Sequence, residues 1–145
     1  MNEKPGPQTP DSQTWANAAH AHAVGRLAED WAWSHLEKSG YRLLARNWRH
    51  SRQEIDLIVE DPEGTLVFVE VKGNRTPGSG HPGERVDALK RQRIARVAEK
   101  YVRLHDFGHR AMRFDVVTLA PLAHGIGIEH FPNAFLPDAR HYHGG

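Results

Sequence analysis

Two carboxylates and a lysine in this 145-residue chain have a spacing that suits a metal-binding site. Asp56 and Glu70 are separated by thirteen residues, and Lys72 follows Glu70 after one. Carboxylate oxygens are the ligands that a hard cation such as Mg²⁺ prefers in proteins. A lysine beside such a cation can orient an attacking water or stabilise the charge that develops on a phosphate. The pattern indicates metal-dependent phosphodiester hydrolysis, and we predict Asp56, Glu70 and Lys72 as its catalytic residues.

Two predicted strands position these side chains. Residues 54–60 follow the period of two that is typical of a strand, and residues 65–72 are rich in β-branched residues. The sequence Asp-Pro-Glu-Gly at 61–64 is a strong turn signal, so the two strands should form an antiparallel hairpin. Pairing across this hairpin can bring Asp56 beside Glu70.

A glutamate and a lysine on a solvent-facing strand are the alternative interpretation, and it fits the sequence poorly. Val67, Phe68 and Val69 precede Glu70 and Val71 follows it, so apolar side chains occupy both faces of the strand. A strand of this kind is normally covered on both sides. A charged group within it has to be paired, bound to a ligand or placed at the end of the strand.

The remaining pattern predicts an α/β domain. Amphipathic stripes indicate helices over 23–39 and 86–104, and apolar runs indicate strands at 41–48, 111–119 and 127–131. Three strands therefore lie between the helices, a strand at 111–119 returns after the second helix, and a short strand at 127–131 follows it. This order predicts a mixed central sheet flanked by helices on both faces.

The ends of the chain and one internal segment have a different composition. Residues 1–22 contain three prolines and few large apolar side chains, so we expect a disordered N-terminal extension. Residues 23–131 form the predicted domain. Within it, residues 73–84 are rich in glycine and predict a mobile loop, and residues 132–145 predict a C-terminal tail.

Charge is strongly segregated along the chain, although the net charge is only +1. Arg42–Arg52 holds four arginines and no acid, Glu54–Glu70 holds six acids and no base, and Arg85–Arg103 has a net charge of +5. Basic segments around an acidic centre suit a site that holds divalent cations against a polyanion, because the basic side chains neutralise phosphates. Solvated helix and strand faces are the alternative reading of the same pattern.

Composition excludes several classes of protein. The chain has no cysteine, which rules out a disulfide framework, a cysteine zinc site and thiol catalysis. No apolar run approaches the roughly 20 residues that a bilayer span needs. The first fourteen residues lack the apolar core of a secretory signal. We therefore expect a cytoplasmic protein that does not bind a membrane.

Several motifs, spread over residues 23–120, match one known family. They are Gly25-Arg26-Leu27-Ala28-Glu29, Gly40-Tyr41, Asn47-Trp48-Arg49, Glu54-Ile55-Asp56-Leu57-Ile58, Val67-Phe68-Val69-Glu70-Val71-Lys72, Arg75, Lys90 with Arg93-Ile94, and Arg113-Phe114-Asp115-Val116-Val117. On these motifs the chain resembles the YraN family of bacterial endonuclease-like proteins, within the PD-(D/E)xK nuclease superfamily. The resemblance implies a restriction-endonuclease-like α-β-β-β-α-β core.

The resemblance also implies roles for individual acids. It places Asp56, Glu70 and Lys72 in the active-site positions of the superfamily, and it adds Glu29 to Asp56 and Glu70 as a metal ligand. A helix-surface glutamate is the alternative for Glu29. Glu54 shares a strand face with Asp56 and is interpreted as a supporting carboxylate behind the ligands, or else as an exposed residue at the start of the strand.

Five basic residues are predicted to bind nucleic acid. Lys90 lies on the apolar stripe of the second helix, where it either extends to solvent or reaches a substrate phosphate. Arg91 and Arg93 lie on the basic face of that helix and can contact backbone phosphates. Arg49 belongs to the first arginine-rich segment. Arg75 completes the set without a fixed role.

These observations lead to one functional hypothesis and two rivals. The leading hypothesis is an endonuclease that hydrolyses DNA phosphodiester bonds with Mg²⁺ or Mn²⁺. A module on the same fold that binds nucleic acid without cleaving it is the first rival. The second is a protein-interaction subunit of a DNA-processing complex, with the apolar segment Phe131–Leu136 as its partner surface.

Overall fold

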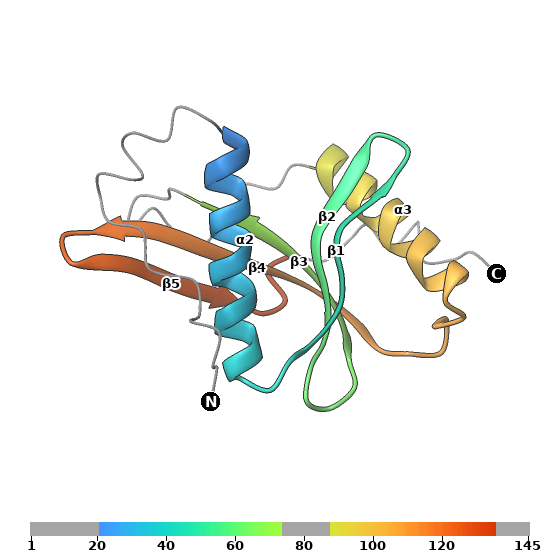
Figure 1. Cartoon of the computed structure of the whole chain (residues 1–145). Helices are drawn as coiled ribbons and strands as arrows, with labels where there is room; N and C mark the ends of the chain where they lie inside the picture. Colours follow the sequence, from blue (N-terminus) through green and yellow to red (C-terminus); the bar gives the residue numbers. More distant parts are fainter. Residues whose placement is uncertain (1–20, 74–87, 136–145) are drawn as a thin grey trace, which may run out of the picture.

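The computed structural model describes residues 21–73 and 88–135, which form one sheet with a helix on each face (Figure 1). Both helices and all five strands predicted from the sequence are present. The elements in chain order are α2 (Ala21–Lys38), β1 (Arg42–His50), β2 (Gln53–Glu60), β3 (Leu66–Lys72), α3 (Ala88–Leu104), β4 (Met112–Leu122) and β5 (Gly125–Phe131).

The sheet is mixed, with the strand order β1-β2-β3-β4-β5. Neighbouring strands are antiparallel except for β3 and β4, which are parallel. Parallel neighbours need a long crossover connection, and α3 lies in that connection. The predicted α/β class, with helices flanking a mixed sheet, is confirmed, and the arrangement is consistent with a restriction-endonuclease-like core.

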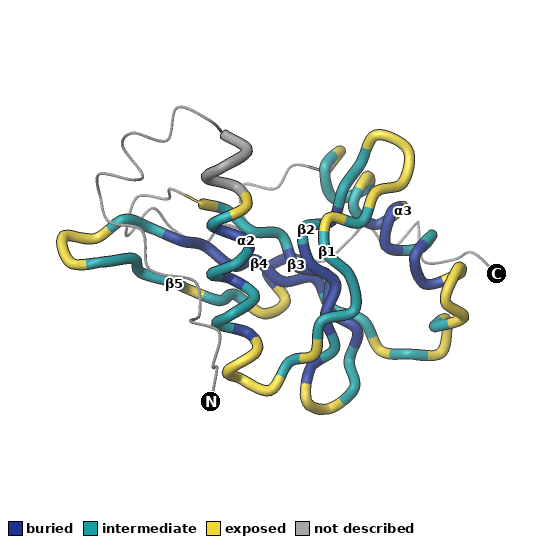
Figure 2. Tube along the Cα trace, in the orientation of Figure 1, coloured by how far each residue is buried: buried dark blue, intermediate teal, exposed yellow. Residues whose placement is uncertain are grey.

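Helix α2 covers one face of the sheet. Its small residues Ala28 and Ala32 and the larger Leu36 recur every four residues and are almost fully buried. They pack in one cluster with Leu57 of β2 and Val67 of β3. Figure 2 shows that buried positions run along the central strands of the sheet. The two alanines let the helix backbone approach the sheet closely, so polar side chains on neighbouring helix positions also come near the strands.

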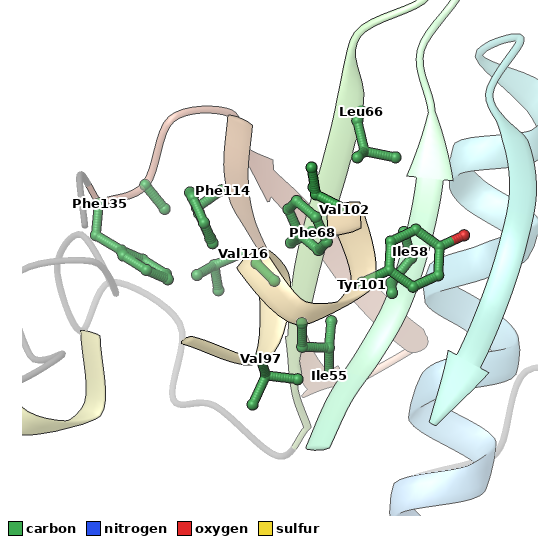
Figure 3. Packing of buried hydrophobic residues seen from close by; sticks show 12 residues of the cluster. Ile55, Ile58, Leu66, Phe68, Val97, Tyr101, Val102, Phe114, Val116 and Phe135 are labelled. Atoms are coloured by element: carbon green, nitrogen blue, oxygen red, sulfur yellow. The ribbon is translucent and has the colours of Figure 1, made fainter. Parts of the chain in front are cut away.

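Helix α3 covers the opposite face through a more aromatic cluster (Figure 3). Val97 and Tyr101 of α3 lie over Phe68 of β3, and the rings of Tyr101 and Phe68 meet edge to face at 6.2 Å. Phe68 also stacks on Phe114 of β4 at 5.3 Å. Residues on β3 therefore face α2 and α3 alternately, as the apolar character of both strand faces predicts.

The segment predicted as the beginning of a tail is part of the core. Ala134 and Phe135 are buried in the α3-side cluster, and the Ala134 N–H donates to the Phe114 carbonyl at 2.9 Å. The prediction of a loose tail from residue 132 is therefore wrong for these residues, because Phe135 covers the ring of Phe114. The same burial removes them from the partner surface predicted at Phe131–Leu136.

Residues 1–20, 74–87 and 136–145 lie outside the part of the chain that the structure describes, and some predictions concern these segments. They include the N-terminal extension, apart from its last two residues, which begin α2, and almost all of the loop predicted at 73–84. Within the part of the chain that the structure describes, no helix is both long and apolar enough to cross a membrane.

Candidate active site

The candidate site lies where β2 and β3 separate. Their ladder runs from Glu60 opposite Leu66 to Leu57 opposite Val69. At the next position, Oδ2 of Asp56 accepts a 2.8 Å hydrogen bond from the backbone N–H of Val71. The side chain of Asp56 therefore takes the place of the ladder at this point.

The strand alternation also changes at Asp56. Leu57 and Val59 pack on the α2 side of the sheet, as the period of two requires. Ile55, however, packs with Ile58 in the cluster on the α3 side. Asp56 lies between these two positions, and it meets Glu29 of α2 while also lining a pocket with Glu70 and Lys90.

Three carboxylates meet here. Glu29 of α2 and Glu54 and Asp56 of β2 each offer an oxygen, and these oxygens all lie within 4.8 Å of one another. Glu29 is only 9% exposed, because the close packing of α2 brings it onto the strands. Such a set of oxygen donors has the chemistry of a site for a hard divalent cation.

One amide holds two of the three carboxylates in place. The Nδ2 group of Asn47 in β1 donates to Oε1 of Glu29 at 2.9 Å and to Oε1 of Glu54 at 2.7 Å. Asn47 has a φ of 49°, a left-handed conformation that asparagine tolerates better than most residues. Arg46 donates to Glu29 at 3.5 Å, and Arg49 donates to Glu54 at 2.6 Å. Side chains of β1 therefore orient both Glu29 and Glu54.

Burial and the neighbouring acids together perturb the pKa of Asp56. Burial raises the pKa of Asp56 to about 7, although the hydrogen bond from the Val71 N–H acts in the opposite direction. The neighbouring charges of Glu29, Glu70 and Glu54 raise this pKa further. A bound cation would favour the ionised carboxylate form of Asp56.

Glu70 faces the other side of the sheet. Its Oε1 forms an ion pair with Nζ of Lys90 on α3. Its Oε2 is buried and has no hydrogen-bond partner among the described residues. Glu70, Lys90 and Asp56 line one pocket of about 70 Å³ between β2, β3 and α3, which is room for a few water molecules.

The structure therefore distributes the predicted ligands differently from the sequence analysis. It brings Glu29 and Asp56 together, as expected, but their third neighbour is Glu54, which the sequence placed behind the ligands. Glu70 remains close enough to Asp56 to affect its pKa, but it pairs with Lys90. Lys72 ends β3, level with Thr118 of β4. The assignment of Glu29, Asp56 and Glu70 as metal ligands and of Lys72 as a catalytic group remains a prediction.

The fold gives Lys90 a contact that neither of its two predicted alternatives included. Its side chain is 45% exposed, yet it lines the pocket and contacts Glu70 instead of extending only to solvent. Arg49 is exposed and paired with Glu54. Arg93 is exposed on α3, Arg91 is partly buried on the same helix, and Arg75 lies outside the described residues.

Sequence reasoning missed the role of β1. Asn47 and Arg46 contact Glu29 from a strand that was predicted only to carry basic residues. Asn47 and Glu29 are eighteen positions apart, and no periodicity links them. An asparagine inside a predicted strand was the available signal, because asparagine is rare there unless its side chain makes specific hydrogen bonds.

Comparison with known proteins identifies relatives over most of the described chain. A family model with the description "Uncharacterised protein family UPF0102" matches residues 28–119. A UPF0102 protein of Nitratidesulfovibrio vulgaris (strain DP4) is 39% identical over 114 residues, which cover 79% of this chain and 84% of that protein. One from Persephonella marina is 39% identical over 111 residues, covering 77% and 91%. One from Oleidesulfovibrio alaskensis is 43% identical over 103 residues, covering 70% and 50%.

A solved structure also matches. It is the structure of Pyrococcus furiosus SfsA in complex with Ca²⁺, which is 15% identical, with a TM-score of 0.33. The match covers 77% of this chain and 63% of that chain.

Proposed function

We propose that this chain, which belongs to the UPF0102 (YraN) family, is a divalent-metal-dependent endonuclease that hydrolyses DNA phosphodiester bonds. The family matches confirm the assignment made from the sequence motifs. One observation carries this proposal. Three carboxylates from α2 and β2 converge at the point where β2 leaves β3, beside the end of the strand that carries Glu70 and Lys72.

The donor set fits a divalent cation on chemical grounds. Glu29, Glu54 and Asp56 offer only oxygens, and three acids this close repel one another unless a proton or a cation lies among them. The raised pKa of Asp56 reflects burial first, and the repulsion by neighbouring acids adds to it. The buried Oε2 of Glu70, which accepts no hydrogen bond from a described residue, is a further acceptor beside the cluster. Mg²⁺ and Mn²⁺ suit such ligands.

The residues of the candidate site would then have separate roles in hydrolysis. A bound divalent cation would activate a water molecule and neutralise charge on the phosphate. Glu29, Glu54 and Asp56 would bind that cation, and Asp56 would give up its proton on binding. Asn47 keeps Glu29 and Glu54 oriented. Lys72 would supply a fixed positive charge for the attacking water or for the phosphate in the transition state.

The proposal is tested with a panel of linear, nicked, flapped and four-way DNA substrates and a matched RNA. Wild-type protein and the Asp56→Asn variant are incubated with Mg²⁺, with Mn²⁺ and with EDTA. We expect cleavage of at least one DNA by the wild type with metal, and none by Asp56→Asn or in EDTA. Absence of cleavage on every substrate with both metals would contradict the proposal.

A second candidate function is favoured by a specific observation. A basic groove lies against the pocket, lined by α3 and by the turn between β1 and β2. A protein that binds nucleic acid without cleaving it would use the same groove and would need no metal. Metal-independent binding in the absence of any cleavage would support this function over the first.

A further inference from the structure

We propose that the groove between α3 and the β1–β2 turn binds the phosphates of a single nucleic-acid strand and leads that strand into the carboxylate pocket. The part of this inference that leads the strand to the pocket rests on the proposed function. The part in which the groove binds phosphates rests on the residues of the groove alone. The groove has a volume of about 650 Å³, much larger than the pocket beside Asp56.

The cations of the groove form a row. Arg93, Arg96, Lys100 and Arg103 of α3 all line it, at intervals of three, four and three residues. This spacing places them on one face of the helix. At 1.5 Å per residue, the row is about 15 Å long. A row of this length can face several successive phosphates, so it matches a linear polyanion better than a single phosphate group.

The hairpin turn forms the second wall. His50, Ser51 and Arg52 line the groove opposite α3, and Figure 1 shows the tip of the β1–β2 hairpin beside that helix. Ser51 has a φ of 57°, which belongs to the tight turn. Arg52 adds a fifth arginine or lysine to the four on α3. A strand lying between the two walls would therefore meet positive charge from both sides.

The positive charge of the groove is only slightly offset. Glu99 is the one acid that lines it, and Glu99 pairs with Arg103 at 2.5 Å. Within residues 21–73 and 88–135, Arg52, Arg93 and Arg96 form no ion pair, and all three are exposed. Cations that the fold leaves without carboxylate partners are available to neutralise phosphates.

The groove borders the pocket of the candidate active site. Gln53 lines both the groove and the small pocket. On α3, Lys90 of the pocket lies one helical turn before Arg93 of the groove. A strand held along the row would thus reach the Lys90–Glu70 pair and Asp56 without a change of direction. The cations of α3 form a single row, which would line up with the phosphates of one strand.

Binding is measured by fluorescence anisotropy with a labelled 12-nucleotide single-stranded DNA in EDTA, over a range of salt concentrations. The test variant is Arg93→Ala/Arg96→Ala. The matched control is Arg26→Ala/Lys38→Ala, which removes two exposed charges from α2 on the opposite face of the sheet. Thermal melting of each variant verifies the fold, because all four side chains are exposed.

We expect the groove variant to bind at least tenfold more weakly and to flatten the log–log salt slope by about 1.4, at roughly 0.7 per phosphate contact on a single strand. The control should bind like the wild type. An equal loss in both variants, or no loss in either, would overturn the proposal. Tighter binding of a matched duplex, or equal binding of inorganic polyphosphate of the same charge, would overturn its assignment to a single nucleic-acid strand.

The outcome is separable from the proposed function because EDTA prevents metal-dependent cleavage. If the groove variant loses binding while the wild type cleaves nothing with Mg²⁺ or Mn²⁺, the groove proposal stands and the endonuclease proposal fails. If the wild type cleaves and the groove variant binds and cleaves normally, the endonuclease proposal stands and the groove proposal fails.

Discussion

The backbone N–H of Val71 donates a hydrogen bond of 2.8 Å to Oδ2 of Asp56, in the place where a strand ladder would continue. This contact joins β3 to a side chain of β2 and leaves the rest of the Asp56 carboxylate facing Glu29 and Glu54. Glu29, Glu54 and Asp56 therefore lie together at the point where the pairing of β2 with β3 ends.

The raised pKa of Asp56 predicts a specific pH dependence of stability. With a folded-state pKa of about 7, against an ordinary value of 3.8, Asp56 holds more protons in the folded than in the unfolded state between these limits. The free energy of unfolding contributed by this group therefore falls as pH rises through that window. We expect metal-free Asp56→Asn to melt above the wild type at pH 8, by about 3–5 °C for a contribution near 1 kcal/mol.

Melting in EDTA at pH 5 and pH 8 checks this prediction. The advantage of Asp56→Asn should shrink at pH 5, where the wild-type carboxyl is already protonated. The control is Glu63→Gln, which changes an exposed acid far from the cluster and should leave the pH profile unaltered. The same difference between Asp56→Asn and the wild type at both pH values would show that ionisation of Asp56 is not the cause.

Asn47 should control metal affinity without binding the metal. Asn47→Gly removes the amide that orients Glu29 and Glu54 but tolerates the φ of 49°. We expect Mn²⁺ affinity to fall about tenfold, the lower end of the effect of groups that orient metal ligands. Isothermal titration calorimetry measures the change.

A matched control for Asn47 exists in the same chain. Asn133 also has a positive φ, of 51°, and lies after β5, away from the three acids. Asn133→Gly should therefore leave Mn²⁺ affinity unchanged. Equal affinity of Asn47→Gly and the wild type would mean that the acids bind the cation without support from β1.

Much of the fold follows from local pattern, and the reason is visible in β3. Val67 and Val69 face α2 while Leu66 and Phe68 face α3, so an apolar strand with cover on both sides could be predicted from composition. The helices follow in the same way from stripes with a period near 3.6. Each of these features depends on neighbours within one element.

The candidate site was less predictable, because it depends on breaks in local pattern. Continued pairing would have put Asp56 opposite Glu70, but the ladder ends at Leu57, and Ile55 already packs on the other side of the sheet. The choice of Lys90 as the partner of Glu70 depends on how the crossover helix docks. Phe135 was assigned to a tail because nothing in its own segment shows that it fills the space beside Phe114.

The Glu70–Lys90 pair should be coupled. Lys90→Met leaves the partly buried Glu70 without its cation, and we expect a loss of about 1 kcal/mol in the free energy of unfolding. Glu70→Gln in the same background should recover part of that loss, because the uncompensated charge is then absent. A double-mutant cycle by urea denaturation measures the coupling, and additive effects of the two substitutions would contradict the pairing.

A second buried carboxylate should matter for stability alone. Asp115 is fully buried and accepts from Arg113, from His130 and from the backbone N–H of Asn133. Burial alone would raise the pKa of Asp115, but these partners bring it below its ordinary value. Its stabilisation is therefore present at neutral pH and is lost as the pH falls towards that lowered pKa.

Asp115→Ala leaves Arg113 without this partner and should destabilise the protein by about 3–5 kcal/mol, as the loss of one member of a buried ion pair does. Glu129→Ala, an exposed acid of β5, is the control. Urea denaturation at pH 7 measures both. If Asp115→Ala costs no more than Glu129→Ala, the network around Asp115 does not hold β4 and β5 together.

The central claim is that the carboxylate cluster and Lys72 form a hydrolytic site. The most direct measurement is the single-turnover rate of Mn²⁺-dependent cleavage by Lys72→Ala and by wild type, on whichever DNA the wild type cuts, with Mn²⁺ and DNA affinities measured on the same samples. We predict that both affinities stay within a few fold, while the rate falls by about a hundredfold or more, as on removal of a fixed charge at a developing transition state. A rate that falls no further than DNA affinity, or a wild type that cuts no DNA with either metal, would contradict the account.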